Sequence, residues 1–340
     1  MSGTKTRVAI LGATGYTASE AIRLLLRHPY VSVTAITSRD PGRRLGQVHP
    51  SLEGRLDLVF EEYRSPEEFA SKADVVFGCL PHGASSSIIP GLLDAGCRVV
   101  DFSADYRLND PAVFAQWYGS ESHDPSRLGK VPYGLPELFR DQIRGSQLVA
   151  NPGCYPQTIV LPLSPLLAAG LVSPAGIIAD SKSGVSGAGR NPKLNNLYPE
   201  CNESISAYGI GTHRHTPEID QVLTTVSGSS VEVIFTPHLT PMDRGILTTT
   251  YSVPTRSVTQ SELYECAREY YRGEPFIQIV EELPATKHVA YTNFCRMAFR
   301  VVRGRVMTIA AIDNLVKGAS GSAVQNMNIL CGYEETTALL

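Results

Sequence analysis

Short apolar runs alternate with helical spacings through the first half of the chain. The run Arg7–Leu11 ends in a glycine-rich turn, and the apolar residues of Ser19–His28 then recur with the spacing of an amphipathic helix. Later apolar runs are separated by turn residues or helix-like stretches, namely Val31–Thr37, Asp74–Leu80 and Arg98–Phe102. Strands that alternate with helices form parallel sheets, so this half predicts a doubly wound α/β domain of the Rossmann type.

The second half contains more strand candidates and fewer helices. Three helix-like segments are expected to cover one face of the sheet that these strands form, namely Cys154–Gly170, Thr216–Val226 and Gln260–Tyr271. Pro162 and Pro165 should kink the first of them, so that only its first turns are regular. We therefore predict an α+β catalytic domain with a mixed, largely antiparallel sheet. The strand candidates are Ile177–Ser181, Val231–Pro237, Ile246–Val253, Phe294–Val302 and Arg305–Ile312.

A chain of 340 residues exceeds the usual size of one hydrophobic core, which predicts two domains. We expect residues 1–150 and 314–340 to form the first domain, with a helix at Gly318–Leu330 packing back on it, and residues 151–313 to form the second. The net charge of −3 gives no basic surplus for nucleic acid, and the apolar stretches are shorter than the roughly 20 residues of a membrane span. Seven scattered cysteines and a start unlike a signal peptide favour a cytoplasmic protein, or a processed plastid protein of the stroma.

The glycine turn after the first strand has the pattern Gly12-x-x-Gly15-x-x-Ala18. In the dinucleotide fingerprint, such glycines let the backbone approach a pyrophosphate at a helix N-terminus. We expect the cofactor to contact this turn, although a tight strand-to-helix turn without a ligand would have the same pattern. The expected contacts are Gly12, Thr14, Gly15, Tyr16 and Thr17.

The end of the second strand distinguishes NADP(H) from NAD(H). An acidic residue there would bind the ribose 2′-hydroxyl of NAD, whereas a 2′-phosphate needs a cation and small donors. The chain has Ser38 and Arg39 at this place, which favours NADP(H), with a solvated loop arginine as the alternative.

Cys154 stands at the start of a helix-like segment, after Asn-Pro-Gly. The positive end of a helix favours thiolate over thiol, so Cys154 is the candidate nucleophile. His213 and His215 precede another predicted helix, with Thr216 as its expected N-cap, and either imidazole could exchange a proton with the thiol. A third metal ligand at suggestive spacing is missing, so we expect no metal site.

Polar clusters in loops supply candidate ligands for anions. Ser103, Arg107 and Arg190 are candidates for a substrate carboxylate or phosphate, because a guanidinium binds such groups in a bidentate way. The serine–glycine loop with Ser183 and Gly184 could open to a phosphate or to nicotinamide. Each of these residues taken alone has a structural role as the simpler explanation.

Several strings together resemble the N-acetyl-gamma-glutamyl-phosphate reductase family, and the resemblance runs from end to end. The most specific are NPGCYPQ and HRHTPEI. The full set is GATGYTA, CLPHG, DFSADYR, YGLPE, NPGCYPQ, SGVSGAGR, HRHTPEI, TPHLTPMDRGIL and DNLVKGASGSAVQNMN.

The resemblance implies a Rossmann domain, a dehydrogenase domain shared with aspartate-semialdehyde dehydrogenase, and a homodimer or homotetramer. It implies that Cys154 is the nucleophile, that His213 is the acid/base group with His215 as the alternative, and that Asn314 orients the nicotinamide amide. The implied reaction is reduction of N-acetyl-L-glutamyl 5-phosphate by NADPH through a cysteine thioester, the third step of arginine biosynthesis from glutamate.

Two kinds of alternative stay open at this point. The same chemistry could act on aspartyl phosphate or on the aminoadipate analogue. A Rossmann protein could also bind NADP as a regulator without catalysis.

Overall fold

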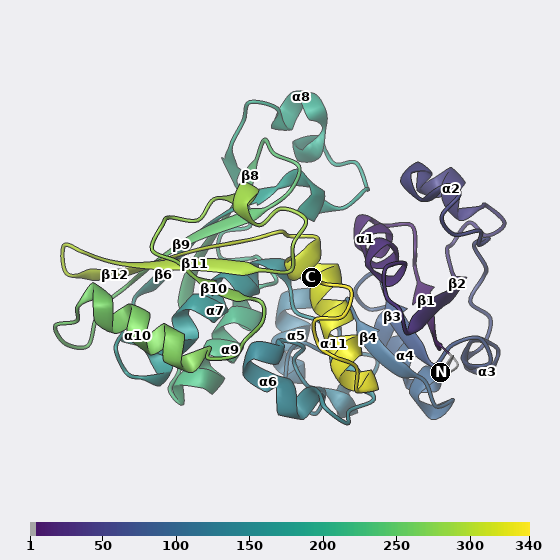
Figure 1. Ribbon diagram of the computed structural model, residues 1–340, viewed down its shortest axis with the longest axis horizontal. Helices are drawn as coiled ribbons and strands as arrows, with labels where there is room; N and C mark the ends of the chain where they lie inside the picture. The colour runs from purple at the N-terminus through teal and green to yellow at the C-terminus, as the bar shows by residue number, and fades with distance from the viewer. Residues whose placement is uncertain (1–4) are drawn as a thin grey trace. The chain divides into compact units, whose positions relative to one another are not determined.

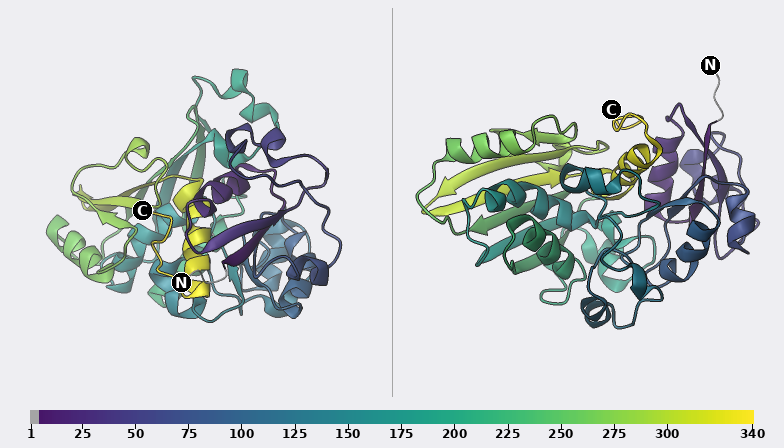
Figure 2. Two further views of the ribbon diagram at one scale, coloured as in Figure 1. Left: turned by 45° about the vertical axis from the view of Figure 1, so that its right-hand side comes forward. Right: turned by 90° about the horizontal axis from the view of Figure 1, so that it is seen from below.

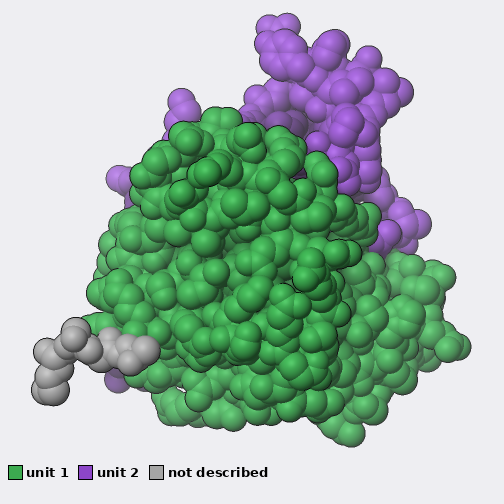
Figure 3. Space-filling model, turned by 90° about the vertical axis from the view of Figure 1, so that its right-hand side faces the viewer, with its two compact units in different colours: residues 1–152, 319–340 green, residues 153–318 purple. Residues whose placement is uncertain are grey.

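The computed structural model describes residues 5–340, and the chain divides into two compact units (Figure 1). Unit 1 consists of Met1–Pro152 and Ala319–Leu340, and unit 2 of Gly153–Gly318, as Figure 3 shows in two colours. Among the described residues, none of the helices has the length and hydropathy needed to cross a membrane.

Unit 1 contains a five-stranded sheet in which every neighbouring pair is parallel. The central strands are apolar and buried along nearly their whole length, as expected for a parallel sheet covered on both faces. The order β2-β1-β3-β4-β5 confirms the predicted Rossmann-type topology. The strands are β1 (Thr6–Leu11), β2 (Val31–Ile36), β3 (Val75–Gly78), β4 (Arg98–Asp101) and β5 (Leu148–Ala150).

Most helices of unit 1 lie between these strands along the chain, and several of them pack on the sheet (Figures 1 and 2). The C-terminal helix α11 (Gly321–Cys331) contacts α1 and α6, and the hydroxyl of Ser320 donates to the Thr17 carbonyl at 2.7 Å. The other helices are α1 (Tyr16–Leu25), α2 (Leu45–Val48), α3 (Pro66–Ala70), α4 (Ser85–Asp94), α5 (Pro111–Tyr118) and α6 (Pro136–Ile143).

Unit 2 contains a seven-stranded mixed sheet of order β10-β11-β12-β9-β6-β8-β7. Two of its pairs, β6 with β8 and β10 with β11, are parallel, and the other four are antiparallel. This agrees with the predicted sheet, although β7 and β10 are too short for the hydrophobic pattern to mark them. The strands are β6 (Ile177–Gly184), β7 (Ser206–Ala207), β8 (Val233–Thr240), β9 (Ile246–Ser252), β10 (Ile277–Ile279), β11 (Cys295–Val302) and β12 (Arg305–Ile312).

Three longer helices cover one face of this sheet (Figure 1). They are α7 (Cys154–Ala168), α9 (Thr216–Ser227) and α10 (Gln260–Tyr270); the short helix α8 (Tyr198–Cys201) lies in the excursion between β6 and α9.

Helix α7 continues through Pro162 and Pro165, so the expectation that only its first turns are regular is wrong. Pro165 has no N–H for the carbonyl of Leu161, four residues earlier. The hydroxyl of Tyr271 donates to that carbonyl at 2.7 Å instead. A tertiary contact thus replaces the hydrogen bond that proline removes.

Candidate active site

Cys154 is the first residue of α7, and its thiol is partly buried and outside any disulfide. The N–H groups of a helical first turn have no acceptor within the helix, so they and the dipole stabilise a thiolate there. Gly318 packs against Cys154, because a Cβ atom on Gly318 would lie 2.9 Å from Cβ of Cys154. The structure therefore places Cys154 at a helix N-terminus, where the sequence predicted it.

Gly153, which precedes α7, contacts two groups of the neighbouring α9 region. Its N–H donates to Oε1 of the buried Glu218 at 2.7 Å. On its other side, a Cβ atom would overlap the ring of His215 at Nε2. The His215 imidazole therefore lies against the residue next to Cys154, and only glycine leaves room for it.

His213 occupies a different environment on the same loop. Its ring packs edge-on against Tyr155, Tyr208 and Phe235, with centroid distances of 5.5, 5.5 and 5.3 Å. Its Nδ1 accepts a hydrogen bond from the backbone N–H of His215 at 3.1 Å. His213 is thus placed to orient the loop that carries His215. Helix α9 begins at Thr216 with His215 as its N-cap, so the expectation that Thr216 is the N-cap is wrong by one residue.

Burial and the charge of Arg214 lower the pKa of His213 from its ordinary value to about 4. An unfolded chain takes up this proton near pH 6.5, whereas the folded chain does so only near pH 4. The free energy of unfolding should therefore fall as pH decreases from 6.5 to 4, by up to about 3 kcal/mol from this group. Urea unfolding of wild type and of His213→Asn across this pH range measures the contribution of His213. Asparagine keeps a hydrogen-bond acceptor but does not titrate. Equal pH slopes for the two proteins would contradict the assignment.

Two tyrosines that the sequence analysis did not single out complete the surroundings of the histidines. The hydroxyls of Tyr155 and Tyr208 lie 2.9 Å apart, and Tyr155 also donates to the His238 carbonyl at 3.3 Å. Burial raises the pKa of Tyr208 to about 12 and raises that of Tyr155 further. Both hydroxyls therefore stay protonated at neutral pH. Tyr155 and Tyr208 are 53 residues apart, so the sequence alone does not indicate that their hydroxyls meet.

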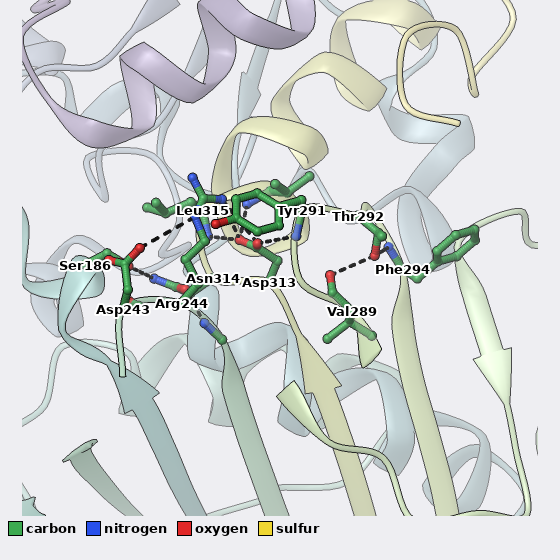
Figure 4. Close-up of polar contacts among 12 residues, drawn as sticks. Ser186, Asp243, Arg244, Val289, Tyr291, Thr292, Phe294, Asp313, Asn314 and Leu315 are labelled. Atoms are coloured by element: carbon green, nitrogen blue, oxygen red, sulfur yellow. Dashed lines mark hydrogen bonds and ion pairs between the residues drawn. The ribbon is translucent and has the colours of Figure 1, made fainter. Parts of the chain in front are cut away.

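Asn314 belongs to a hydrogen-bonded cluster at the end of β12 (Figure 4). Its Oδ1 accepts from the Gly245 N–H at 2.7 Å, and its Nδ2 donates to the Ser186 hydroxyl at 2.9 Å. These two contacts fix the plane of the carboxamide and determine which side carries the oxygen and which the nitrogen. Such a group can present a donor and an acceptor in a set direction to a ligand.

The neighbouring Asp313 holds this cluster in place (Figure 4). Its buried carboxylate accepts from the N–H groups of Tyr291, Leu315 and Val316 at 2.7, 2.8 and 3.0 Å, and pairs with Arg244 at 3.2 Å. The Arg244 guanidinium also lies over the Tyr291 ring, 4.5 Å from its centroid. Neither Arg244 nor Tyr291 was predicted, since nothing in the sequence brings them together.

The serine–glycine loop lies beside Asn314. Gly184 has no room for a side chain against the Asp243 carbonyl, and a Cβ on Gly187 would lie 3.2 Å from Ser183 Oγ and 3.6 Å from Asn314 Nδ2. The structure thus brings Ser183, Gly184 and Asn314 together within unit 2, whereas Arg190 lies further along the loop and is exposed.

In unit 1, the glycine turn joins β1 to α1 as predicted. Gly12 has φ of +71°, and a Cβ atom there would lie 2.6 Å from the Cys79 carbonyl oxygen, so other residues are excluded. Gly15 precedes α1 without a capping side chain, while Thr14 and Tyr16 are exposed and Thr17 is half-buried. The turn therefore offers helix N–H groups to an anion.

Ser38 and Arg39 follow β2 in the same unit. The hydroxyl of Ser38 forms a local turn with the backbone of Asp40, donating to its carbonyl at 2.7 Å. Arg39 is exposed. The guanidinium therefore stands in solvent near the carboxyl end of a parallel strand, the edge at which such sheets bind ligands.

Ser103 and Arg107 lie inside unit 1 rather than on its surface. The Ser103 hydroxyl donates to Asp101 at 2.6 Å and accepts from the Asp105 N–H at 3.1 Å. Arg107 donates to the carbonyls of Asn151 and Phe102, both at 2.8 Å. Arg107 therefore fixes the backbone three residues before Cys154 in the sequence.

Two family comparisons cover most of the chain. Residues 7–146 match the family described as semialdehyde dehydrogenase, NAD binding domain. Residues 154–314 match the family described as semialdehyde dehydrogenase, dimerisation domain.

A full-length relative from Rhodopirellula baltica, named N-acetyl-gamma-glutamyl-phosphate reductase, is 50% identical over 100% of both chains. The fold is similar to aspartate semialdehyde dehydrogenase II from Vibrio cholerae complexed with ASA, with a TM-score of 0.74, 16% identity and coverage of 97% of this chain and 99% of that one. It is also similar to aspartate semialdehyde dehydrogenase with NADP from Candida albicans, with a TM-score of 0.71, 17% identity and coverage of 96% and 98%.

Proposed function

Because this chain belongs to the N-acetyl-gamma-glutamyl-phosphate reductase family, we propose that it reduces N-acetyl-L-glutamyl 5-phosphate to N-acetyl-L-glutamate 5-semialdehyde with NADPH and releases phosphate. This is a step of arginine biosynthesis. The observation that carries the proposal is the placement of Cys154 at the start of α7, next to the glycine that seats the His215 imidazole.

Each unit, taken by itself, contains residues that fit a part of NADP(H). The left-handed Gly12 and the start of α1 suit the pyrophosphate, and exposed Arg39 with Ser38 suits the 2′-phosphate. The fixed carboxamide of Asn314, with Ser183 and Gly184 beside it, suits the nicotinamide amide. When bound, the reduced cofactor supplies a hydride to the acyl carbon.

In the first step, the Cys154 thiolate attacks the acyl carbon of the substrate. A C–S bond forms, the bond from carbon to the phosphate oxygen breaks, and phosphate leaves with its electron pair. His215 takes the thiol proton as the thiolate forms. The N–H groups at the start of α7 are placed to stabilise the carbonyl oxygen.

In the second step, the thioester carbon gains a hydride and its oxygen becomes negative. Protonated His215 stabilises this oxygen, and collapse re-forms the C=O bond and expels the Cys154 sulfur. The proton on His215 then returns to the sulfur, so that the thiol and the neutral imidazole are restored. The aldehyde leaves as the product.

We propose His215 rather than His213 as the acid/base group. His215 lies against Gly153, whereas the Nδ1 of His213 is occupied by the His215 N–H, and its ring is packed among aromatic side chains. A pKa near 4 also makes His213 a poor proton acceptor at neutral pH.

Among the proposed anion-binding residues, Arg190 is the exposed one and is the candidate for the substrate carboxylate. Arg107 and Ser103 bind backbone and carboxylate groups of unit 1. We propose that these two residues act mainly through the segment that leads into Cys154.

Substitution of Arg190 by glutamine should raise KM for the aldehyde without a matching loss of kcat, because the substrate carboxylate would lose its cationic partner. An unchanged KM would reject the role of Arg190 in binding the carboxylate.

The reverse reaction tests the proposed function. NADP+ reduction is measured with N-acetyl-L-glutamate 5-semialdehyde and phosphate, and again with NAD+ and with aspartate semialdehyde. Phosphate-dependent activity with the first aldehyde and a preference for NADP+ is expected. Activity only with aspartate semialdehyde would identify aspartyl phosphate as the substrate instead, and inactivity with both aldehydes would reject the proposal.

We further propose a homodimer formed through the open face of the unit 2 sheet. Ile178, Ile234 and Tyr251 lie side by side across β8, β6 and β9, and remain 40%, 61% and 38% exposed. A contiguous apolar row on a sheet face indicates a protein interface. The match to a dimerisation domain over residues 154–314 supports dimerisation through unit 2.

Ile234→Glu should weaken self-association at least about 100-fold, because a charge would be buried without a partner. Light scattering over a dilution series measures it, with Leu283→Glu as the matched control, since Leu283 is also exposed but lies outside the sheet. Dissociation by the control and not by Ile234→Glu would place the interface elsewhere.

A further inference from the structure

Glu218 is a buried carboxylate beside the reacting groups, and the mechanism above gives it no role. It lies in the first turn of α9 and is 1% exposed. Its Oε1 accepts the Gly153 N–H at 2.7 Å, across 65 residues of sequence. The carboxylate therefore joins the N-terminus of the nucleophile helix to the helix that follows the histidine loop.

Gly153 relates Glu218 to the acid/base pair. One side of this glycine donates to the carboxylate, and the position of its absent Cβ lies against Nε2 of His215. Cys154 is the next residue. Gly153 is therefore flanked by the carboxylate of Glu218, the imidazole of His215 and the thiol of Cys154. This region is largely buried, so charges there are weakly screened.

We propose that Glu218 is a positioning residue that keeps the Cys154–His215 pair protonated until substrate arrives, an inference that rests on the proposed function. A nearby negative charge raises the proton affinity of any group. On His215, this charge stabilises the imidazolium that forms when Cys154 loses its proton. On Cys154, it offsets part of the stabilisation of the thiolate by the helix N-terminus.

A purely structural role would need only the hydrogen bond. Glutamine retains a side-chain oxygen that can accept the Gly153 N–H, but it removes the charge. Glu218→Gln therefore separates the two roles. The other titratable side chains packed around the histidine loop stay unchanged in the test, namely His213, Tyr155 and Tyr208. The charged neighbours in the sequence also stay unchanged, namely Arg214 and Asp220 near Glu218 and Lys317 next to Gly318.

The experiment is alkylation of Cys154 by iodoacetamide in the free enzyme as a function of pH, followed on the peptide that contains Cys154. Removal of the charge should move the midpoint of this profile toward acid by on the order of one pH unit. The pH profile of kcat/KM should move in the same direction. Glu232→Gln is the matched control, because it removes an exposed carboxylate of the same unit, and its midpoint should equal that of wild type.

An unshifted alkylation midpoint in folded Glu218→Gln would overturn the inference. Glu218→Asp keeps the charge, so it should retain the wild-type midpoint even if kcat falls; a shift equal to that of glutamine would also overturn it. Alkylation needs no substrate, so this outcome is independent of the proposed function. Failure of wild type to reduce NADP+ would reject the function and leave the alkylation result standing.

Discussion

Cys154→Ser is expected to lower kcat/KM at least about 10⁴-fold, because the proposed reaction passes through a covalent bond to sulfur. A serine hydroxyl at this place ionises far less readily than a thiol, even at the N-terminus of α7. NADPH binding, followed by the fluorescence of the cofactor, should change little, since the cofactor-binding residues are left intact. The measurement is the initial rate of the reverse reaction with and without phosphate.

Cys201→Ser is the matched control for this loss. Cys201 is another partly exposed thiol of unit 2 outside any disulfide, but it lies in α8 and outside the candidate site. The control should keep the wild-type rate, and iodoacetamide should still inactivate it. A Cys154→Ser enzyme with activity near that of wild type would show that the thioester mechanism does not operate.

His215→Asn is expected to lower kcat about 10²- to 10⁴-fold, the usual contribution of a general acid/base group. The ring that lies against Gly153 is lost, and asparagine cannot take the thiol proton. His213→Asn should cost less than about tenfold, because its side-chain oxygen can replace Nδ1 as the acceptor of the His215 N–H. The two substituted positions lie two residues apart on one loop, so the variants control for each other.

The ratio of the two rates decides between the histidines. Steady-state kcat across pH 6 to 9, with circular dichroism to show that both variants are folded, is sufficient. A larger loss in His213→Asn than in His215→Asn would return the acid/base role to His213. In that case the surroundings of His213 would have to rearrange when substrate binds, since the free protein occupies its Nδ1.

The fold could be predicted because its signals are local. Buried parallel strands such as β1 and β3 appear in the sequence as continuous apolar runs. The turn at Gly12 needs a residue with positive φ, and the glycine in the sequence indicates it. The same local rules failed in α7, where the Tyr271 hydroxyl serves the carbonyl that Pro165 leaves without a donor. That partner lies 110 residues away and is invisible to periodicity. Strands β7 and β10 contain two and three residues, too few to show alternation.

The candidate site was predictable only in part, for a similar reason. Cys154 and the histidine loop could be found from their positions before helices. The choice between His213 and His215 depends on Gly153, whose missing side chain matters only once α7 and α9 are packed together. Glu218 and the Arg244–Asp313 pair are also tertiary features, since their partners are distant in the sequence.

The proposed reaction depends on an acyl thioester on Cys154, and a half-reaction without phosphate reveals this intermediate. The enzyme is mixed with N-acetyl-L-glutamate 5-semialdehyde and NADP+ in the absence of phosphate, and absorbance and protein mass are recorded together. We expect a burst of one NADPH per site, a mass gain of one N-acetylglutamyl group on the Cys154 peptide, and renewed turnover when phosphate is added. Continued turnover without phosphate, or a burst that leaves the Cys154 peptide unmodified, would contradict it.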